Sequence, residues 1–241
     1  MKDIPLLILH GWNLSKEKFS PLIRELMKRD YQVYCPDLPG FGKANKPHRS
    51  FYLSDYADFI EYFIKKKNFN QVILIGHSFG GRIGIKLAVK NPNILRALIL
   101  TGTPGISPVS WYKKSFFWML AKMGKTFLLL PFFSSISEKL KKLLYKFAGA
   151  TDYYQTTKDM KQTFRNITKE NLIPYLSQVV TPVLLIWGEE DRIVPKDIAD
   201  KMARLMKKTR VITIPDARHG VPWTHAKVFA EIVDKFLKYE I

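Results

Sequence analysis

The sequence predicts an α/β protein in which a mostly parallel sheet of about six strands is flanked by helices. Short β-rich apolar runs alternate along the chain with segments of helical periodicity, which is typical of such a sheet. The 241 residues are 46% hydrophobic and 25% charged, so the chain holds enough apolar material for a substantial core. Polar residues of catalytic type follow several apolar runs, at the sheet edge where open α/β sheets bind ligands.

The first half of the chain supplies three strands, each followed by a helix. One of these helices is expected to begin near Ser54, a favoured N-cap residue, and to bury a stripe of aromatic and aliphatic side chains. The expected strands cover 4–11, 31–37 and the start of 72–90, and the expected helices cover 16–28, 53–67 and the end of 72–90.

The second half supplies three more strands and an interruption. Strands are expected over 94–102, 181–191 and 209–217, with a helix between the last two and a final helix over 222–238. Residues 106–177 show helical periodicity without strands, and their first part is rich in aromatic residues. We therefore expect a core of residues 1–105 and 178–241, interrupted by a helical cap over 106–177 that covers the carboxyl edge of the sheet.

The formal net charge of +18 is the unusual feature of the composition. Lysines are scattered over most of the expected helices and we find no nucleic-acid-binding motif, so we expect solvated basic faces and no nucleic-acid partner. Between Ile106 and Ala148 there are eight lysines and one acidic residue, Glu138. This local excess favours, as a second interpretation, a weak contact of the cap with an anionic membrane surface.

Cysteine content and apolar runs favour a cytoplasmic protein. The single cysteine, Cys35, excludes an intrachain disulfide and is expected as a small buried hydrophobe in a strand. The first residues do not resemble a secretory signal, because their apolar run is short and meets a turn at once. The longest apolar region, Phe116–Phe133, is interrupted by two lysines, a glycine and a proline, so it does not fit a transmembrane span.

The pentapeptide Gly76-His77-Ser78-Phe79-Gly80 fits the G-x-S-x-G nucleophile elbow, and it stands between a buried strand and a helix, as this motif requires. In such a turn the serine is lifted above the sheet edge, and side chains at the glycine positions would collide with their surroundings. The first N–H groups of the helix then point towards a negative charge forming beside the serine. The alternative, in which Ser78 only caps the helix, leaves the residues downstream unexplained.

A serine nucleophile needs a base, and an acid that orients the base. Asp191, with Glu189 and Glu190 beside it, stands at the end of the fifth expected strand, and His219 follows the sixth. Both therefore stand at the carboxyl ends of strands, as Ser78 does. The chain order serine, aspartate, histidine is the order that this elbow requires.

These motifs together resemble the α/β-hydrolase superfamily over nearly the whole chain. "HGW" is similar to the family's oxyanion loop, "DLPGFGKANKP" to its Asp-x-x-Gly-x-Gly loop, "GHSFGG" to its elbow, "WGEEDRIVP" to its acid loop and "PDARHGVPW" to its histidine loop. The resemblance implies a cap inserted after the family's sixth strand. It also implies Ser78 as nucleophile, Asp191 as orienting acid and His219 as general base, with the oxyanion bound by the backbone N–H groups of Trp12 and Phe79.

The remaining titratable residues near these motifs are expected in supporting roles. His10 and His77 should brace their turns through hydrogen bonds, and His225 should lie on the surface of the last helix. Glu189 and Glu190 should be solvated. The chain departs from the family in one respect, because it starts directly at the strand before His10, without the usual β-hairpin. The segment 31–37 is then expected at an exposed sheet edge, and a monomer and a homodimer both stay open.

Serine at the elbow favours acyl transfer to water through a covalent acyl-enzyme. The resemblance points the same way, because dehalogenases and epoxide hydrolases of the superfamily carry aspartate there. The first hypothesis is therefore a carboxylesterase for small to medium acyl groups, acting on a small-molecule ester without a cofactor or a metal. The residues expected to line its pocket are His10, Gly11, His77, Arg82, Trp111, Phe116, Trp118 and Val194.

Two further hypotheses stay open. Arg82 follows two glycines, as in a menaquinone-pathway lyase that the elbow resembles, so the second hypothesis is a lyase or C–C bond hydrolase whose carboxylated substrate Arg82 binds. For Arg82 itself, a solvated position in the first turns of the elbow helix is the preferred interpretation. The third hypothesis is a non-catalytic ligand-binding or membrane-surface protein, because a fold does not fix a function.

Overall fold

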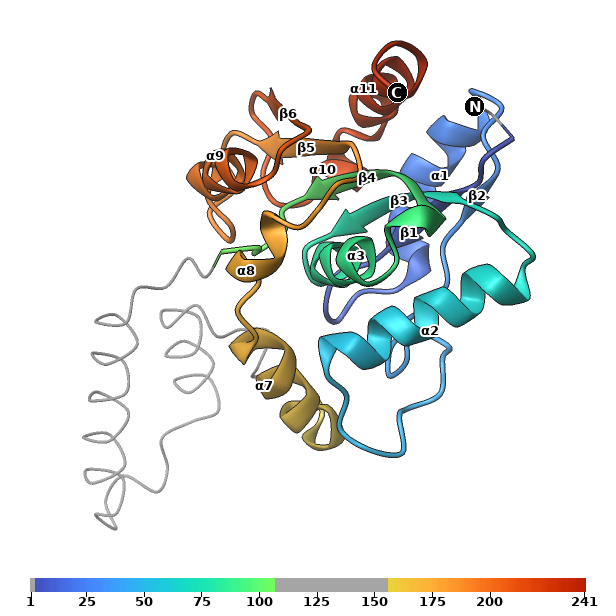
Figure 1. The fold of residues 1–241 in the computed structure, drawn as a ribbon, viewed down its shortest axis with the longest axis vertical. Helices are drawn as coiled ribbons and strands as arrows, with labels where there is room; N and C mark the ends of the chain where they lie inside the picture. Colours follow the sequence, from blue (N-terminus) through green and yellow to red (C-terminus); the bar gives the residue numbers. More distant parts are fainter. Residues whose placement is uncertain (1–2, 107–155) are drawn as a thin grey trace.

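The computed structural model of the chain describes residues 3–106 and 156–241 (Figure 1). Its strands form one sheet in the order β2-β1-β3-β4-β5-β6, and every neighbouring pair is parallel. The strands are β1 (Leu6–Leu9), β2 (Val33–Tyr34), β3 (Val72–His77), β4 (Leu95–Thr101), β5 (Val183–Gly188) and β6 (Thr209–Ile214). The six-stranded parallel sheet predicted from the alternating pattern is thereby confirmed.

Helices cover both faces of this sheet (Figure 1). Alternate strand residues belong to two apolar clusters: Ile8 and Ile73 pack with α1 and α11, whereas Leu7 and Leu74 pack with α2, α3 and α9. Because both faces are covered, every residue of β1, β3 and β5 is buried. The helices are α1 (Ser20–Met27), α2 (Leu53–Lys66), α3 (Phe79–Lys90), α7 (Lys161–Lys169), α8 (Ile173–Leu176), α9 (Lys196–Leu205), α10 (Val221–Thr224) and α11 (Ala226–Tyr239).

The strand expected over 31–37 is reduced to the two residues of β2. Asp37 is the physical reason, because its carboxylate accepts the backbone N–H groups of Lys16 at 2.9 Å and Lys43 at 3.0 Å, which turns the chain into a loop. Cys35 is consequently half-buried beside the strand rather than buried within it. β2 does lie at one end of the sheet, as predicted, and the described residues contain no strand outside it.

Three helix boundaries also differ from the expected ranges. The expected helix over 16–28 opens as a 3-10 turn, Lys16–Phe19, before α1 begins. The N-cap of α2 is Tyr52 rather than Ser54, two residues earlier, because Asp55 accepts the Tyr52 N–H at 2.7 Å and so completes a capping box at that position. The final helix is divided into α10 and α11 at His225, which is half-buried.

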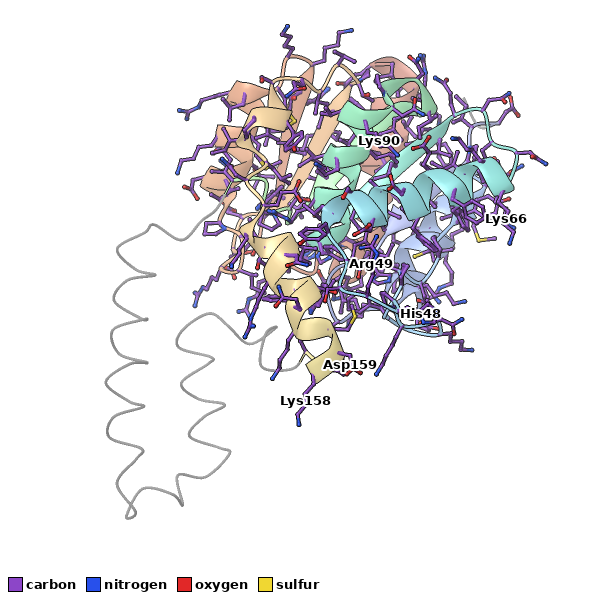
Figure 2. All side chains as sticks on the ribbon, turned by 60° about the horizontal axis from the view of Figure 1, so that its bottom comes forward. His48, Arg49, Lys66, Lys90, Lys158 and Asp159 are labelled. Carbon is purple, nitrogen blue, oxygen red and sulfur yellow. The ribbon has the colours of Figure 1, made fainter. Side chains whose placement is uncertain are left out.

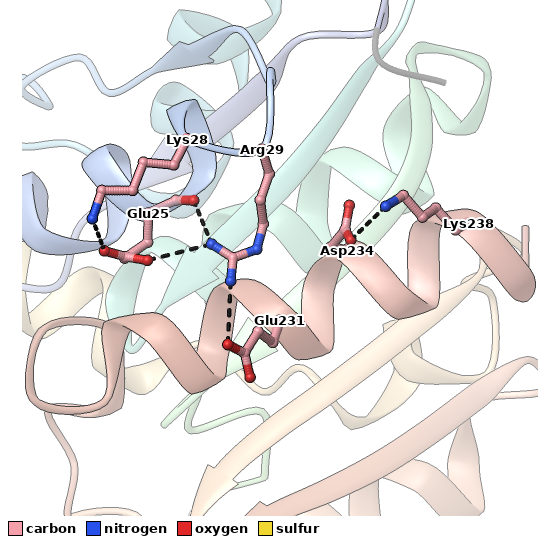
Figure 3. Close-up of polar contacts among 6 residues, drawn as sticks. All are labelled: Glu25, Lys28, Arg29, Glu231, Asp234 and Lys238. Carbon is pink, nitrogen blue, oxygen red and sulfur yellow. Dashed lines mark hydrogen bonds and ion pairs between the residues drawn. The ribbon is translucent and has the colours of Figure 1, made fainter.

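Ion pairs join α11 to the end of α1 where the two helices meet solvent (Figure 3). Arg29 lies between Glu25 and Glu231, at 3.3 Å from a carboxylate oxygen of each, and Lys238 pairs with Asp234 at 2.7 Å. Partly exposed pairs of this kind contribute about 0–1 kcal/mol each. The apolar cluster therefore holds the two helices on the sheet, and the ion pairs chiefly balance the charge of this face.

The cap predicted over 106–177 lies for the most part outside the described residues, so its boundaries stay a prediction. Its described portion contains a 3-10 turn, Lys158–Met160, followed by α7 and α8. α7 is fastened to the chain before α2, because Thr163 accepts the N–H of Phe51 at 3.0 Å and Asn166 donates to the Phe51 carbonyl at 3.3 Å. Across residues 3–106 and 156–241, none of the helices has the length and apolar character needed to cross a membrane.

Candidate active site

Ser78 occupies the turn between β3 and α3 in a conformation that side-chain-bearing residues rarely adopt. Its φ is 51° and its ψ is −111°, and its N–H donates to the Thr101 carbonyl at 2.9 Å. The serine side chain is half-buried and makes no capping hydrogen bond to α3, so a mere N-cap role does not account for it. A residue held in such a conformation by its surroundings is a marker of a functional position.

Two glycines make this turn sterically feasible. A Cβ on Gly76 would lie 2.5 Å from the Cα of Gly81, and a Cβ on Gly80 would lie 2.2 Å from the Leu9 carbonyl oxygen. The first turn of α3 therefore packs directly on the backbone of β3 and on the end of β1. The glycine–serine–glycine pattern is a requirement of this close packing.

Asp191 and His219 form a hydrogen-bonded pair at the same edge of the sheet. The Nδ1–H of His219 donates to Oδ2 of Asp191 at 2.7 Å, while Oδ1 accepts the backbone N–H groups of Ile193 and Val194, both at 2.9 Å. Asp191 is only 5% exposed. A carboxylate held by three donors has one orientation, so it fixes the tautomer and the orientation of the imidazole.

The two glutamates beside Asp191 are exposed, as expected. The acid and histidine loops approach each other closely, because a Cβ on Gly188 would lie 2.4 Å from the Ala217 carbonyl oxygen, and the Glu190 N–H donates to that same carbonyl at 2.9 Å. Gly188 therefore allows the contact that brings Asp191 to His219.

Gly102 connects the histidine to the serine turn. It has a φ of 53°, and a Cβ on it would lie 2.7 Å from Cε1 of His219 and 3.4 Å from Oδ2 of Asp191. The preceding residue, Thr101, accepts the Ser78 N–H. The end of β4 thus supports the imidazole on one side and the serine turn on the other.

His77 is fully buried and packs against His219, with 4.8 Å between the ring centroids. Its Nε2–H donates to the His219 carbonyl at 3.1 Å, so it braces the histidine loop rather than the elbow turn in which His77 itself stands. Burial lowers the pKa of His77 to about 3, so this ring is neutral at ordinary pH. Its Nδ1 faces Gly11, where a Cβ would come within 2.9 Å, and finds no hydrogen-bond partner among the described residues.

His10 braces the loop after β1 in a similar manner. Its Nε2 accepts the Leu38 N–H at 2.9 Å, so the proton resides on Nδ1, which donates to the Gly11 carbonyl at 2.8 Å. Burial lowers the pKa of His10, so it too is neutral. His10 and Gly11 therefore shape the loop that carries Trp12. Both imidazole nitrogens of His10 are used in hydrogen bonds within the protein, so contacts within the protein account for the positions of His10 and Gly11 without a bound ligand.

Trp12 and Phe79 come together beside Ser78, with 5.3 Å between their ring centroids. Phe79 is the first residue of α3, so its backbone N–H has no partner within the helix. The Trp12 indole packs on Phe41 and Phe164, at 4.7 and 5.1 Å, and donates to the Thr156 hydroxyl at 2.8 Å. The loop after β1 is thus held by aromatic contacts from distant parts of the chain.

Arg82 is not solvated, contrary to the preferred interpretation of the sequence, because it is only 7% exposed. Its guanidinium donates to three backbone carbonyls: Pro104 at 2.5 Å, Ile167 at 2.9 Å and Glu170 at 2.6 Å. Burial lowers the pKa of Arg82 to about 10, which leaves it charged at neutral pH. Arg82 therefore fastens α3 to the end of α7 and to the chain leaving β4.

The other residues expected to line a pocket fall into two groups. Val194 is buried and supports the acid loop, since its carbonyl accepts the Trp187 indole N–H at 2.8 Å. Trp111, Phe116 and Trp118 lie outside the described residues, so their placement in a pocket stays a prediction. Within residues 3–106 and 156–241, no group of three His, Cys, Asp or Glu side chains is arranged to hold a metal ion.

Gly102, Phe41 and Thr156 were not predicted from the sequence as parts of the site. Only Gly102 carried a signal, because a glycine directly after a strand often marks a turn with positive φ. A hollow of about 780 Å³ opens beside the loop that carries Trp12. It is lined by Asn13, Leu14, Ser15, Glu17, Lys18, Gly40, Phe41 and Gly42.

Comparison with known proteins gives a consistent result. A family model described as alpha/beta hydrolase fold matches residues 4–226. A pimeloyl-[acyl-carrier protein] methyl ester esterase of Shewanella woodyi is 26% identical over 93% of this chain and 90% of its own length, and Lipase 1 of Psychrobacter immobilis is 27% identical over 92% and 73%. An esterase structure from Exiguobacterium antarcticum superposes with a TM-score of 0.75 at 21% identity, covering 98% of this chain and 92% of that one.

Proposed function

Because the chain belongs to the alpha/beta hydrolase fold family, we propose that it is a serine hydrolase that cleaves carboxylic esters of small to medium acyl groups. The observation that carries the proposal is the Asp191–His219 pair, at 2.7 Å, on the sheet edge where Ser78 occupies its positive-φ turn. Relatives that are named as an esterase and a lipase support ester hydrolysis as the reaction.

The proposed mechanism uses His219 as the proton carrier. Asp191 occupies Nδ1, so Nε2 is the nitrogen that takes the proton of the Ser78 hydroxyl as Oγ attacks the ester carbonyl. The tetrahedral oxyanion is bound by the backbone N–H groups of Trp12 and Phe79, each contributing on the order of 3 kcal/mol to the transition state. Buried Asp191 stabilises the imidazolium that forms.

The second half of the reaction reverses these proton transfers. The imidazolium of His219 gives its proton to the departing alkoxide, so the alcohol leaves and the acyl group stays on Ser78 Oγ. Water then loses a proton to Nε2 as its oxygen attacks the acyl carbonyl. Collapse of the second oxyanion releases the carboxylic acid and returns the proton to Ser78.

Arg82 bears on the choice between this proposal and a lyase or C–C bond hydrolase. A carboxylated substrate would need guanidinium donors, and both terminal nitrogens of Arg82 already donate to backbone carbonyls. Freeing them would leave three carbonyls without their charged donor. The ester hydrolase is therefore the better supported reaction.

The test measures hydrolysis of a panel of aryl esters of increasing acyl length by the parental protein and by Ser78→Ala. Both proteins are also treated with a serine-directed fluorophosphonate label. Parental protein should hydrolyse short esters and take up the label, and Ser78→Ala should do neither while keeping the melting temperature of the parent. Ser177→Ala, which removes an exposed serine at the end of α8, is the matched control and should behave as the parent. Substantial hydrolysis by Ser78→Ala would show that the mechanism is wrong. Unlabelled, inactive parental protein would instead favour the non-catalytic binder.

A further inference from the structure

Positive charge is concentrated on two neighbouring segments of the surface. The loop 43–50 and the segment 156–169 carry seven lysine and arginine side chains and one carboxylate, Asp159. Lys46 joins the segments through an ion pair with Asp159 at 3.0 Å. Figure 2 shows Arg49, His48, Lys158 and Asp159 at the same end of the molecule. We call this surface the basic strip; its cations are Lys43, Lys46, Arg49, Lys158, Lys161, Arg165 and Lys169.

Nearby carboxylates offset only part of this charge. Arg49 pairs with Asp55, whose carboxylate is also engaged by the start of α2. The Lys46–Asp159 pair has both side chains more than half exposed, so water screens it strongly. Lys43, Lys158 and Lys169 are exposed and extend the positive charge along the strip.

The face formed by α1 and α11 provides the contrast. Residues 20–30 and 226–240 carry six basic and five acidic side chains. Figure 3 shows six of them in ion pairs, of which Arg29–Glu231 joins the two helical segments. The net charge of the protein is therefore unevenly distributed. A strip of mostly one sign is a surface feature that attracts a polyanionic partner.

The segment 156–169, which carries four of the seven cations of the strip, also contacts the candidate active site. On its inner side Thr163 and Ile167 are buried, and Phe164 packs on the Trp12 ring. Thr156 accepts the Trp12 indole N–H at 2.8 Å. The outer side of the same segment presents Lys158, Arg165 and Lys169 to solvent. A partner bound to the strip would therefore lie next to the edge that holds Ser78.

We propose that the basic strip docks the protein on an anionic phospholipid bilayer, with the candidate active site turned towards the lipid surface. Lysine ammonium groups spread over two segments match a surface of many mobile phosphates, and each lysine near such a surface strengthens partition about fivefold. Sequence-independent binding of single-stranded nucleic acid instead combines positive charge with free aromatic stacking platforms, whereas the Trp12 and Phe164 rings pack on each other. Docking goes beyond the proposed ester hydrolysis and does not depend on it. Only the advantage of docking, which is access to esters within the lipid surface, rests on the proposed function.

The test is co-sedimentation with vesicles of phosphatidylglycerol and phosphatidylcholine, compared with phosphatidylcholine alone, at low and at high salt. Full-length protein should sediment with the anionic vesicles at low salt only. Lys43→Gln/Lys158→Gln/Lys169→Gln should weaken partition about a hundredfold. The matched control, Arg24→Gln/Lys227→Gln/Lys235→Gln, removes three exposed cations from the α1 and α11 face and should bind nearly as the parent. Thermal unfolding of both variants checks that they are folded.

Equal weakening by the two triple variants would overturn the proposal, because it would show a response to net charge alone. No binding by the parent, or unchanged binding by the strip variant, would also overturn it. Tighter binding to a single-stranded oligonucleotide than to the vesicles, lost in the strip variant, would assign the strip to nucleic acid. Ser78→Ala should bind vesicles as the parent does, which separates a failure of docking from a failure of the proposed hydrolysis.

Discussion

Replacing Gly102 with alanine should lower the turnover of the proposed esterase about 30- to 100-fold. The new Cβ would lie 2.7 Å from Cε1 and 2.8 Å from Nδ1 of His219. Carbon atoms pack at about 3.5 Å, so the imidazole must move by roughly 0.8 Å, and a misplacement of about 1 Å costs on the order of a hundredfold in rate. The φ of 53° adds a backbone cost of about 1 kcal/mol, which lowers the melting temperature by about 3 °C.

The assay is the steady-state turnover of a short aryl ester, measured together with the melting temperature. Asn68→Ala is the matched control, because Asn68 also has positive φ, 57°, but follows α2 at the opposite, amino-terminal edge of the sheet. It should lose comparable stability and keep full turnover. If Gly102→Ala loses the expected stability and yet turns over like the parent, the reasoning that places His219 in the reaction is refuted.

Three further predictions concern the partners of the candidate site. Asp191→Asn should reduce kcat by about four orders of magnitude, because an amide does not hold the imidazole in the required tautomer; steady-state kinetics checks this, and KM should change little. Arg82→Met should lower the free energy of unfolding in urea by about 3–5 kcal/mol by leaving three carbonyls unpaired, whereas a change below about 1 kcal/mol would contradict the buried contacts. The pKa of His77 is about 3 when folded and near 6.5 when unfolded, so protonation favours the unfolded chain and stability is lost as pH falls below 6.5. His77 alone contributes a loss of about 2 kcal/mol between about pH 7 and pH 5. His77→Gln should reduce the total loss in urea titrations by that amount and leave the share of buried His10, while His48→Gln, at an exposed position, should retain the full loss.

The sheet and the aspartate–histidine pair were accessible from the sequence because their determinants are local. Buried parallel strands are continuous apolar runs, and the glycines around Ser78 stand where a strand must turn into a helix. Asp191 was distinguishable from its neighbours by the resemblance of its loop to the family's acid loop, in which it has the family spacing before Ile193, Val194 and Pro195. The described geometry pairs it with His219 and leaves both glutamates exposed.

The surroundings of Arg82 were not accessible, because its partners lie far away in sequence. Its guanidinium binds carbonyls that are 22, 85 and 88 residues distant, and backbone carbonyls carry no residue-specific signal. The indole of Trp12 meets Thr156 across 144 residues for the same reason. The short β2 and the early start of α2 depend on the carboxylates of Asp37 and Asp55, whose partners a periodic pattern does not reveal.

Arg82 binds the chain on both sides of the long excursion from the core. Pro104 lies where the chain leaves the core, and Ile167 and Glu170 lie where it returns. The Arg82 side chain therefore holds both ends of this excursion against α3, the helix that follows Ser78. Lengthening a loop whose ends are already held costs little, about 0.6 kcal/mol for each doubling. We therefore expect the length of the intervening stretch to be changeable at small cost in stability, with the turn at Ser78 left in place by the Arg82 contacts.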